Sequence, residues 1–399
     1  MVPLRYIGID PTVPATSNAQ LLTKETNAKL LFNIVAREGS ISRAQLAKVS
    51  GLSPSTVSVL TEELIRNHML LEAGTGESAP TGRKPIMLEV DPSGMQIPCF
   101  AFRPGGLVYV LYDLKLNVIE RFIQEYPSEL INHNSAYFTP ANEPVLNLFT
   151  ETIEKSQKLD MSKVRVFTIS FYGAFMRDTS VFASGVLGWH LSTSFVDSLR
   201  EKYNIPFLLS NNAQLLAYAE KSLSNTDHSN LLYVHLDAGV GSGVILDGVP
   251  YVGECGISGE IGHMLVGGQR LENLVSTKAI RELLKERHGI TSLKTAGSAL
   301  EIGDMAVTNT MREVATNIAT GLNNVLCILG SMDVYIGGYA MYALGPVFLD
   351  LIRNALQNFG FRRVLMHSPL HFSQLDENGD CFGAAKAFVD NIFTVVIPQ

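Results

Sequence analysis

The first regular pattern in the chain is a pair of short amphipathic helices joined by a Gly-Leu step. Ser42 and Gln45 form the capping-box pattern of a first helix, Gly51 permits a tight turn, and Ser53 before Pro54 is typical of the start of a second helix. The apolar positions fall at helical spacing and are expected to close one small core; they are Leu46, Val49, Leu52, Val57, Leu60 and Leu64. The pattern predicts a helix-turn-helix.

A helix-turn-helix is a DNA-binding motif whose second helix enters the major groove. On that hypothesis, polar side chains at the two helix starts contact DNA, and we expect them to be Arg43, Ser53, Ser55, Thr56 and Ser58. Most of these side chains are too short for bidentate contacts, so direct base recognition would be modest. A helical hairpin with no role in DNA binding has the same pattern, so the motif alone leaves that alternative open.

Strand patterns at Met69–Glu72 and Ile86–Val90 flank a loop rich in Gly, Ser and Thr. Their position directly after the second helix predicts a β-hairpin wing. Arg83 and Lys84 lie at the tip of this wing, before Pro85. Two cations on a stiff, extended segment are suited to phosphates or to a narrow A·T-rich minor groove. A solvated basic loop is the alternative.

Beyond residue 95, strand and helix patterns alternate, which is typical of an α/β fold. The expected strands are Leu107–Tyr112, Val164–Ser170, Phe207–Ser210, Leu231–Leu236, Ser242–Leu246 and Val334–Ile336. The expected helices are Val145–Lys158, Ser194–Tyr203, Ala213–Ser222, Thr277–His288, Ala306–Leu329 and Ala343–Phe359. The order is consistent with two duplicated lobes. We expect residues 1–20 to be a disordered tail and residues 21–92 to form the winged helix-turn-helix domain.

Length and charge fit a DNA-binding unit that carries a larger body. A chain of 399 residues that is 46% hydrophobic can form two or three domains with sizeable cores. Residues 1–95 hold nine Lys and Arg against nine Asp and Glu, so the net charge of −7 lies in the rest of the chain. The acidic balance of the body therefore does not extend to the DNA-binding unit.

The cysteines indicate a reducing compartment. Cys99, Cys255, Cys327 and Cys381 are scattered and form no Cys-x-x-Cys pair. The N-terminus has no secretory pattern, and no apolar run has the length that a membrane helix needs. We expect a cytoplasmic protein with buried thiols and no membrane partner.

Two glycine-rich segments, Asp237–Gly248 and Gly256–His263, resemble the signature of the ROK family of sugar kinases and sugar-responsive repressors. Other segments that agree in order are Gly188-Trp189, Leu209–Ala213, Tyr335–Gly338 and Phe382–Ala385. The resemblance runs from about residue 24 to 390 and includes the winged helix, which belongs to the repressor branch. It implies an α/β fold with an actin-like (RNase H-like), two-lobed ATPase-type body. Residues 93–212 with 384–399 would form the smaller lobe and residues 213–383 the larger lobe.

The resemblance also locates the groups that a ROK kinase uses, and three are missing. A kinase needs a carboxylate to accept the sugar hydroxyl proton and glycine loops to bind ATP phosphates. The family's catalytic Asp matches Asn212, whose amide cannot act as a base. The family's Asp-x-Gly-Gly-Thr loop corresponds to Ala101–Leu107, which holds no acid, and its Gly-Thr-Gly becomes Asp237-Ala-Gly. We expect no catalytic residue, no ATP binding and no kinase activity.

Sugar recognition needs only placed donors and acceptors, and most of these are retained. By the resemblance, Asn211, Glu260, His263 and Glu272 match residues that hold sugar hydroxyls, and Asn212 can still form hydrogen bonds. We expect these carboxylates and the imidazole to be buried in the cleft, where a polyhydroxylated ligand would satisfy them. The family's Asn before the Gly-Trp step is absent. Taken without the resemblance, the Glu-x-x-His pair could equally be a structural pair that binds no ligand.

The family's metal site is absent. ROK proteins usually have a Cys-x-Cys-x4-Cys segment after the His of Gly-His. That His and the three Cys bind a structural zinc. Here only residues 264–271 separate His263 from Glu272, without a cysteine, and Cys255 is the only cysteine nearby. We therefore expect no zinc and no other cofactor.

The sequence thus predicts a sugar-responsive transcriptional regulator, which we expect to be a repressor, with a non-catalytic body. Its partners would be operator DNA with an inverted repeat, a sugar effector and a second copy of the chain, because one winged helix contacts only a half-site. Two alternatives stay open. One is a ROK sugar kinase fused to a DNA-binding unit, and the other is a repressor that senses a protein partner.

Overall fold

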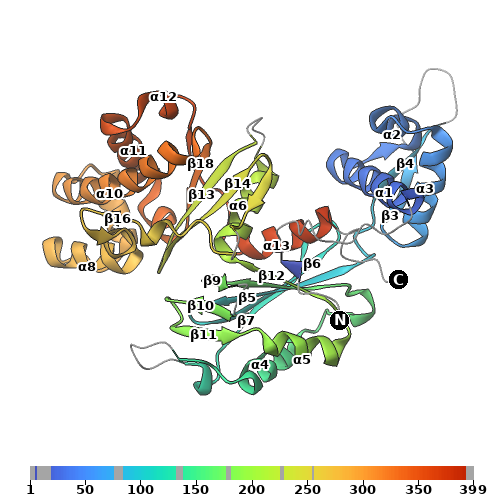
Figure 1. Ribbon diagram of the computed structural model, residues 1–399, viewed down its shortest axis with the longest axis horizontal. Coiled ribbons are helices and arrows are strands. Elements are labelled where there is room, and N and C mark those ends of the chain that lie inside the picture. Colours follow the sequence, from blue (N-terminus) through green and yellow to red (C-terminus); the bar gives the residue numbers. More distant parts are fainter. Residues whose placement is uncertain are drawn as a thin grey trace.

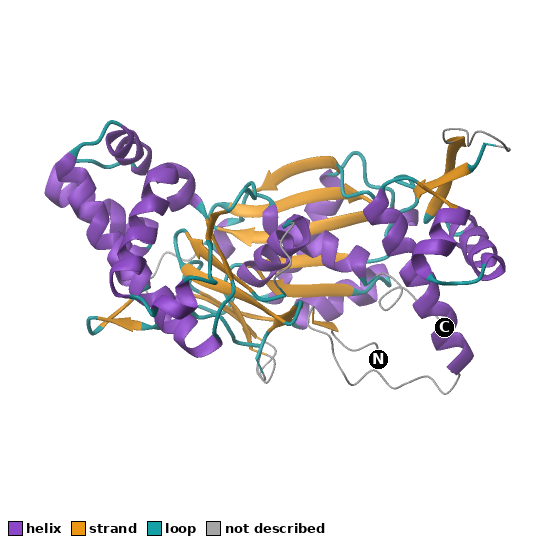
Figure 2. Cartoon of the chain, turned by 90° about the horizontal axis from the view of Figure 1, so that it is seen from above, coloured by secondary structure: helices purple, strands orange, loops and turns teal. Residues whose placement is uncertain are grey.

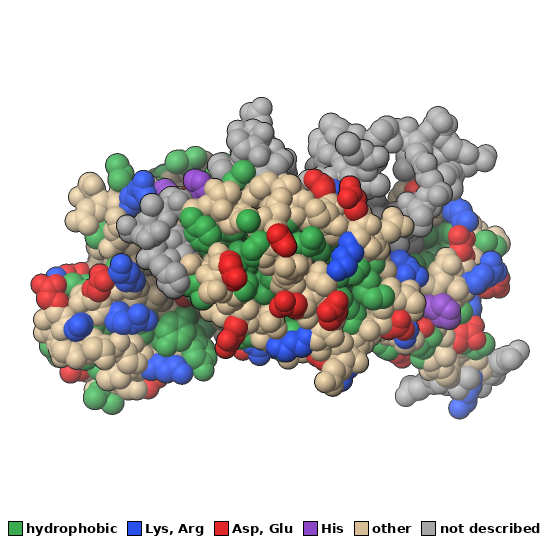
Figure 3. All heavy atoms as spheres, turned by 90° about the horizontal axis from the view of Figure 1, so that it is seen from below, with side chains coloured by type: hydrophobic (Ala, Val, Ile, Leu, Met, Phe, Trp, Pro, Cys, Tyr) green, Lys and Arg blue, Asp and Glu red, His purple; other side chains and the backbone are tan. Residues whose placement is uncertain are grey.

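The computed structural model describes residues 5–6, 19–75, 84–131, 138–176, 181–224, 229–253 and 256–391. A small N-terminal unit, residues 19–90, lies at one end of the molecule, and two lobes built on separate sheets form the body (Figures 1 and 2). On the face in Figure 3, acidic side chains are spread across the middle of the molecule. Among the described residues, no helix is both long and apolar enough to cross a membrane.

The N-terminal unit packs three helices against a small sheet. The helices are α1 (Ala19–Glu38), α2 (Arg43–Ser50) and α3 (Pro54–Arg66), and the strands in order are β2 (Ile41–Ser42), β4 (Ile86–Val90) and β3 (Leu70–Thr75). Ser42 and Gln45 form the capping box of α2, and Gly51 ends this helix with a φ of 71°. Ser53 caps α3 with Pro54 in the first turn. The predicted helix starts are confirmed.

Most of the expected core of this unit is enclosed. The residues with exposed fractions of 4% or less are Leu46, Val57, Leu60 and Leu64. Leu52 is half-buried, but Val49 is 52% exposed, so the prediction for Val49 is wrong. Ala47 joins Leu46 on the buried face of α2. Because two residues rotate a helix by about 200°, Val49 lies away from the face to which Ala47 belongs.

The smaller lobe is built on a six-stranded sheet. Its strands in order are β1 (Arg5–Tyr6), β12 (Phe207–Asn211), β8 (Phe167–Phe171), β5 (Gln96–Arg103), β6 (Gly106–Asp113) and β7 (Val118–Gln124). Beside it lie α4 (Asn142–Lys155), α5 (Ser194–Tyr203) and a sheet of β9 (Ala174–Met176), β10 (Val181–Ser184) and β11 (Trp189–Ser192). Short 3-10 turns cover Ser128–Leu130 and Met161–Lys163.

β1 departs from the prediction of a disordered tail over residues 1–20. Its two residues pair in parallel with Leu208 and Leu209 of β12, and α1 already begins at Ala19. The rest of the predicted tail lies outside the described residues. A strand pairs with an open sheet edge through backbone hydrogen bonds. Such pairing cannot be predicted from the pattern of side chains.

The larger lobe repeats the strand arrangement of the smaller one. Its sheet has the order β15 (Val249–Tyr251), β14 (Val240–Leu246), β13 (Leu231–Leu236), β18 (Asp333–Gly337) and β19 (Leu370–Phe372). In each lobe three consecutive strands are antiparallel neighbours, and two later strands join in parallel beside the first. The helices of this lobe are α7 (Glu272–Val275), α8 (Thr277–His288), α9 (Leu293–Glu301), α10 (Met305–Leu329), α11 (Tyr339–Phe359) and α12 (Arg362–Leu365). The two lobes therefore share one topology.

Two helices, α6 (Asn212–Leu223) and α13 (Gly379–Asp390), lie between the two sheets (Figure 1). α6 packs on β13 and β14, and α13 packs on β5 and β8. The helices touch so closely that a Cβ on Gly383 would lie 2.1 Å from the backbone oxygen of Leu215. The predicted return of the chain to the smaller lobe at residue 384 falls inside α13. The other domain limits stay predictions.

One continuous cluster of buried apolar residues joins the N-terminal unit to the body. It includes Leu31 and Phe32 of α1, Ile97 of β5, and Cys381 and Phe388 of α13. The N-terminal unit and the body therefore share one packed interior.

The described cysteines are free thiols. Cys99 and Cys381 are buried, as expected, but Cys327 is exposed and the expectation is wrong for it. Cys327 lies in the last turns of α10 beside Ile328, which is 80% exposed, so this part of the helix faces outward. Cys255 lies outside the described residues.

Candidate functional site

The first turn of α3 carries the hydroxyl groups that the sequence predicts at the DNA. Ser53 Oγ accepts a hydrogen bond from the backbone N of Thr56 at 3.2 Å and lies 2.9 Å from Ser55 Oγ. Ser58 Oγ donates to the backbone O of Pro54 at 3.0 Å. Ser55 is exposed, whereas Thr56 and Ser58 are half-buried. These residues lie together at one end of α3, with their hydroxyl groups bonded within the helix.

Arg43, by contrast, is held inside the N-terminal unit. Its guanidinium forms an ion pair with Glu72 at 2.9 Å, and its Nε donates to Thr61 Oγ1 at 3.1 Å. Arg43 thus braces α2 against α3 and β3. Lys84 is exposed immediately before β4, and β3 and β4 pair as the antiparallel arms of the predicted wing. Arg83 lies outside the described residues.

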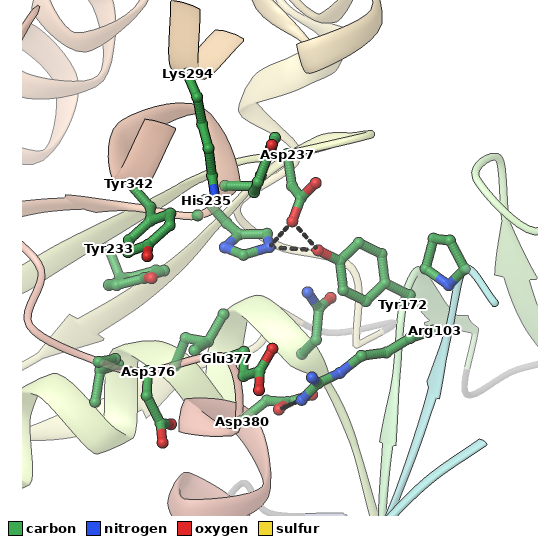
Figure 4. Close-up of a pocket in the computed structure, with 16 residues that line it drawn as sticks. Arg103, Tyr172, Tyr233, His235, Asp237, Lys294, Tyr342, Asp376, Glu377 and Asp380 are labelled. Carbon is green, nitrogen blue, oxygen red and sulfur yellow. Dashed lines mark hydrogen bonds and ion pairs between the residues drawn. The ribbon is translucent and has the colours of Figure 1, made fainter. Parts of the chain in front are cut away.

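A cavity of about 790 Å³, here called the cleft cavity, lies between the lobes (Figure 4). The smaller lobe contributes Arg103 and Tyr172, and the larger lobe contributes His235, Asp237 and Lys294. Further lining residues are Asn212, Tyr233, Tyr339, Tyr342, Asp376, Glu377 and Asp380. A cavity of this size with converging polar groups suits a small-molecule ligand.

Tyr172 bridges the two lobes across the cleft cavity (Figure 4). Its hydroxyl lies 2.5 Å from His235 Nε2 and donates to Asp237 Oδ2 at 3.1 Å. Burial raises the pKa of Tyr172 well above its usual range, and Asp237 raises it further. Burial lowers the pKa of His235, although Asp237 opposes this. The bridge therefore joins a neutral phenol, a neutral imidazole and one carboxylate.

A buried ion pair between Arg103 and Asp380 also lines the cleft cavity. The Arg103 guanidinium contacts one carboxylate oxygen of Asp380, and Ser170 Oγ donates to the other at 2.7 Å. Their side chains are 16% and 5% exposed. Burial by itself lowers the pKa of Arg103, but Asp380, Cys381 and Tyr172 together raise it, and the net shift is upward. Arg103 therefore stays charged beside Asp380.

The predicted sugar residues Asn211 and Asn212 have different roles in the fold. Asn211 Oδ1 accepts from the backbone N of Ala213 at 2.8 Å, and its Nδ2 donates to the backbone O of Gly173. It therefore caps α6 and ties this helix to the segment after β8. Asn212 is buried and lines the cleft cavity. Of the five predicted sugar residues, only Asn212 lines this cavity.

Glu260, His263 and Glu272 form a separate cluster. His263 Nε2 lies 4.0 Å from Glu260 Oε2, and the pKa of Glu260 is raised by burial, lowered by His263 and raised by Glu272. The side chains of Glu260 and His263 are 37% and 54% exposed, so the prediction that they are buried is wrong.

The reason lies in the glycines around this cluster. A Cβ on Gly259 would lie 2.0 Å from the Ser242 backbone oxygen, and one on Gly262 would lie 2.3 Å from that of Val240. The backbone itself therefore packs on β14, with Ile261 buried, Glu260 half-buried and His263 exposed.

A tight hairpin fills the segment where the family has its cysteines. β16 (Leu265–Val266) and β17 (Gln269–Arg270) pair antiparallel. They turn at Gly267 and Gly268, whose φ angles are 59° and 82°. Two consecutive positive φ values are typical of a type I′ hairpin turn. The absence of zinc stays a prediction.

A model of the ROK family matches residues 131–390. The chain belongs to the ROK family. A model described as winged helix-turn-helix DNA-binding matches residues 25–70. The N-terminal unit of this ROK protein is therefore a winged helix-turn-helix, as the sequence predicts.

The relatives of this ROK protein include regulators that it matches along nearly its whole length. The xylose repressor of Bacillus subtilis (strain 168) is 24% identical over 388 residues, which cover 94% of this chain and 98% of that protein. The DNA-binding transcriptional dual regulator NagC of Escherichia coli (strain K12) is 22% identical over 381 residues, covering 89% and 90%.

Solved structures show the same fold. A ROK family transcriptional regulator, a homolog of the Escherichia coli MLC protein, matches with a TM-score of 0.76 and 20% identity over 93% of this chain and 98% of that one. The ROK hexokinase from Thermus thermophilus matches with a TM-score of 0.58 and 20% identity, over 73% and 97%. The predicted architecture, a winged helix-turn-helix followed by an actin-like two-lobed body, is confirmed.

Two turns in the cleft cavity depart from the phosphate-binding motifs of ROK kinases. When Gly105 and Gly106 are aligned with the glycine pair of Asp-x-Gly-Gly-Thr, Arg103 stands where a kinase has its acid. Asp237 replaces the first glycine of Gly-Thr-Gly. The chain therefore departs from both motifs in residue type.

The sequence interpretation missed Tyr172, His235 and Asp380. Tyr172 follows directly after β8, a position where strand ends in α/β sheets commonly carry binding groups. The end of that strand is therefore a signal that could have identified it. No local signal marks Asp380 as the partner of Arg103, because the two lie 277 residues apart.

Proposed function

We propose that this ROK protein is a transcriptional repressor that binds operator DNA through its winged helix and releases it when a carbohydrate occupies the cleft between its lobes. Its relatives include a xylose repressor and an N-acetylglucosamine repressor. The single observation that carries the proposal is that α13 connects the cleft cavity with the N-terminal unit.

One end of α13 lies in the cleft cavity and its other end is bonded to α1. Asp380, in the first turn, lines the cavity and pairs with Arg103. Asn391, directly after the last turn, accepts a hydrogen bond from Lys29 Nζ of α1 at 3.1 Å. A helix is a stiff element, so a lobe movement that displaces Asp380 also displaces α1.

We place the carbohydrate between Asn212 and the cluster of Glu260, His263 and Glu272. These amide, imidazole and carboxylate groups supply both donors and acceptors for sugar hydroxyls. The partial exposure of Glu260 and His263 leaves them accessible to a ligand. Asn211 supports this site by capping α6, so that Asn212 faces the cavity.

We propose that the body does not phosphorylate its ligand. The amide of Asn212 cannot accept the hydroxyl proton, Arg103 cannot hold magnesium, and Asp237 opposes a triphosphate. These three departures involve separate parts of the cleft, so the single change Asn212→Asp leaves the other two in place. They speak against the alternative of a sugar kinase fused to a DNA-binding unit.

For DNA binding we propose a homodimer on an inverted repeat, because each winged helix reaches one half-site. Ser53, Ser55, Thr56 and Ser58 lie at the start of the recognition helix, and we propose that Arg83 and Lys84 bind phosphates. Arg43 stiffens the unit through Glu72 and contributes to DNA binding in that way.

Thermal unfolding in the presence of D-xylose, N-acetyl-D-glucosamine, D-glucose and sucrose tests the proposal. A sugar that binds only the folded state raises the melting temperature by mass action, by an amount that grows with its concentration. We expect one of them to stabilise the wild type and Glu282→Ala, a change at an exposed residue of α8, but not Glu260→Ala. Failure of all sugars together with retained DNA binding would favour a protein effector.

A further inference from the structure

α3 presents a continuous row of exposed side chains on one side, here called the outer stripe. It consists of Ser55, Val59, Glu62 and Arg66. Spacings of three and four residues place these side chains above one another on a helix. The buried Val57 and Leu60 fix the opposite face against the core of the N-terminal unit, so the orientation of the outer stripe is set.

Val59 stands out in this stripe because its side chain is apolar and 61% exposed. Its neighbours Thr56 and Ser58 direct their hydroxyls back into the helix, toward Ser53 Oγ at 2.8 Å and the Pro54 backbone O at 3.0 Å. Along the outer stripe from the start of α3, the two methyl groups of Val59 are therefore the next groups after Ser55 that a ligand can contact. A valine in a helix has essentially one rotamer, so binding costs it little side-chain entropy.

The charges along the stripe indicate what faces it. Glu62 follows Val59, and its carboxylate would be repelled by a phosphate. Within the stripe the only cation is Arg66, at its end, and exposed Lys48 adds another on α2; cations make many of the phosphate contacts in protein–DNA complexes. In a helix-turn-helix, the first helix crosses the DNA backbone while the second lies in the groove. In that docking geometry the middle of the outer stripe would face base edges.

We propose that Val59 packs against the 5-methyl group of a thymine in the major groove and selects a T·A pair at that position. This inference rests on the proposed function in DNA binding and names what one side chain recognises. The thymine methyl is the apolar group that bases present in the major groove. Burying one methyl group corresponds to a preference of about three- to fivefold for thymine.

The test uses a duplex that the protein selects from a random-sequence pool, in which each thymine under α3 is replaced in turn by uracil. This change removes only the methyl group. We expect one replacement to weaken binding of the wild type about three- to fivefold. The same replacement should not change binding of Val59→Ala. This variant should bind the thymine duplex as weakly as the wild type binds the uracil duplex. Val49→Ala, which removes an exposed valine of α2, should keep the wild-type response.

Two results overturn the inference in distinguishable ways. If the protein binds a selected duplex but every uracil replacement is neutral, or the loss persists in Val59→Ala, the inference is wrong and the proposed function stands. If the protein selects no duplex from the pool, both fail together. Circular dichroism of Val59→Ala, an exposed position, establishes that the variant is folded.

Discussion

Lys29 of α1 donates a hydrogen bond to Asn391 Oδ1 at 3.1 Å. Asn391 follows the last residue of α13 and donates in turn to the Ala387 backbone O at 3.0 Å. The first turn of the same helix holds Asp380 at the cleft cavity. This hydrogen bond therefore joins the DNA-binding unit to the helix that lines the proposed effector cleft.

If α13 transmits the state of the cleft, Lys29→Met should weaken the response of DNA binding to effector. A hydrogen bond from a charged group contributes about 1.5 to 3 kcal/mol, so we expect the effector-induced loss of DNA affinity to shrink by roughly tenfold or more. DNA affinity without effector should stay within about twofold. Lys24→Met, which breaks an ion pair with Glu63 inside the N-terminal unit, is the control. Equal responses in both variants would show that this hydrogen bond carries no signal.

Loss of one partner of the buried pair Arg103–Asp380 should destabilise the body. Asp380→Asn leaves the guanidinium without a counter-charge, and breaking a buried pair typically costs about 3–5 kcal/mol. Chemical denaturation should show this as a lower free energy of unfolding. The double change Arg103→Met with Asp380→Leu removes both charges and should recover much of the loss. A single variant as stable as the wild type would contradict the assignment.

Stability should fall on acidification through His235. Burial lowers the pKa of His235 below 6.5 in the folded protein. Below about pH 6.5 the unfolded chain therefore binds more protons than the folded protein does. The free energy of unfolding then decreases as the pH falls below about 6.5. His235→Gln cannot titrate and should lose less stability between about pH 7 and pH 5. Parallel losses in the two proteins would remove His235 from this pH dependence.

The wing should contribute to DNA affinity by binding phosphates. Removing one cation that binds a phosphate lowers the slope of log affinity against log salt concentration by about 0.9. We expect this change for Arg83→Ala and for Lys84→Ala, measured on the selected duplex. Arg287→Ala, which alters an ion pair with Glu313 in the larger lobe, should leave the slope unchanged. A wild-type slope in both wing variants would exclude the wing from the interface.

The parts of the fold that follow from local physics were predictable. The caps at Ser42 and Ser53 involve atoms within three residues, and both form as expected. Helices α5 and α8 have the predicted bounds because a capping position or a positive-φ residue delimits them. β5 was missed, since it lacks the alternation of a half-exposed strand and holds Pro98, a residue that argues against a central strand.

The site was only partly predictable, because its geometry depends on how the lobes meet. The hydrogen bond between Tyr172 and His235 spans 63 residues, and the ion pair of Arg103 with Asp380 crosses most of the chain. The resemblance placed Asn212 in the cleft, but could not reveal that Gly259 and Gly262 hold the backbone against β14 and leave Glu260 only half-buried. Such close approaches are set by tertiary packing.

The most direct test of the account is the affinity of the full chain for its selected duplex, measured by fluorescence anisotropy with and without D-xylose, N-acetyl-D-glucosamine or D-glucose. We expect one sugar to weaken DNA binding by roughly 5- to 150-fold, the usual range of coupling between two sites. This effect should need no ATP and should be lost in Glu260→Ala. An affinity that no sugar changes, or sugar-dependent ATP turnover by the wild type, would contradict it.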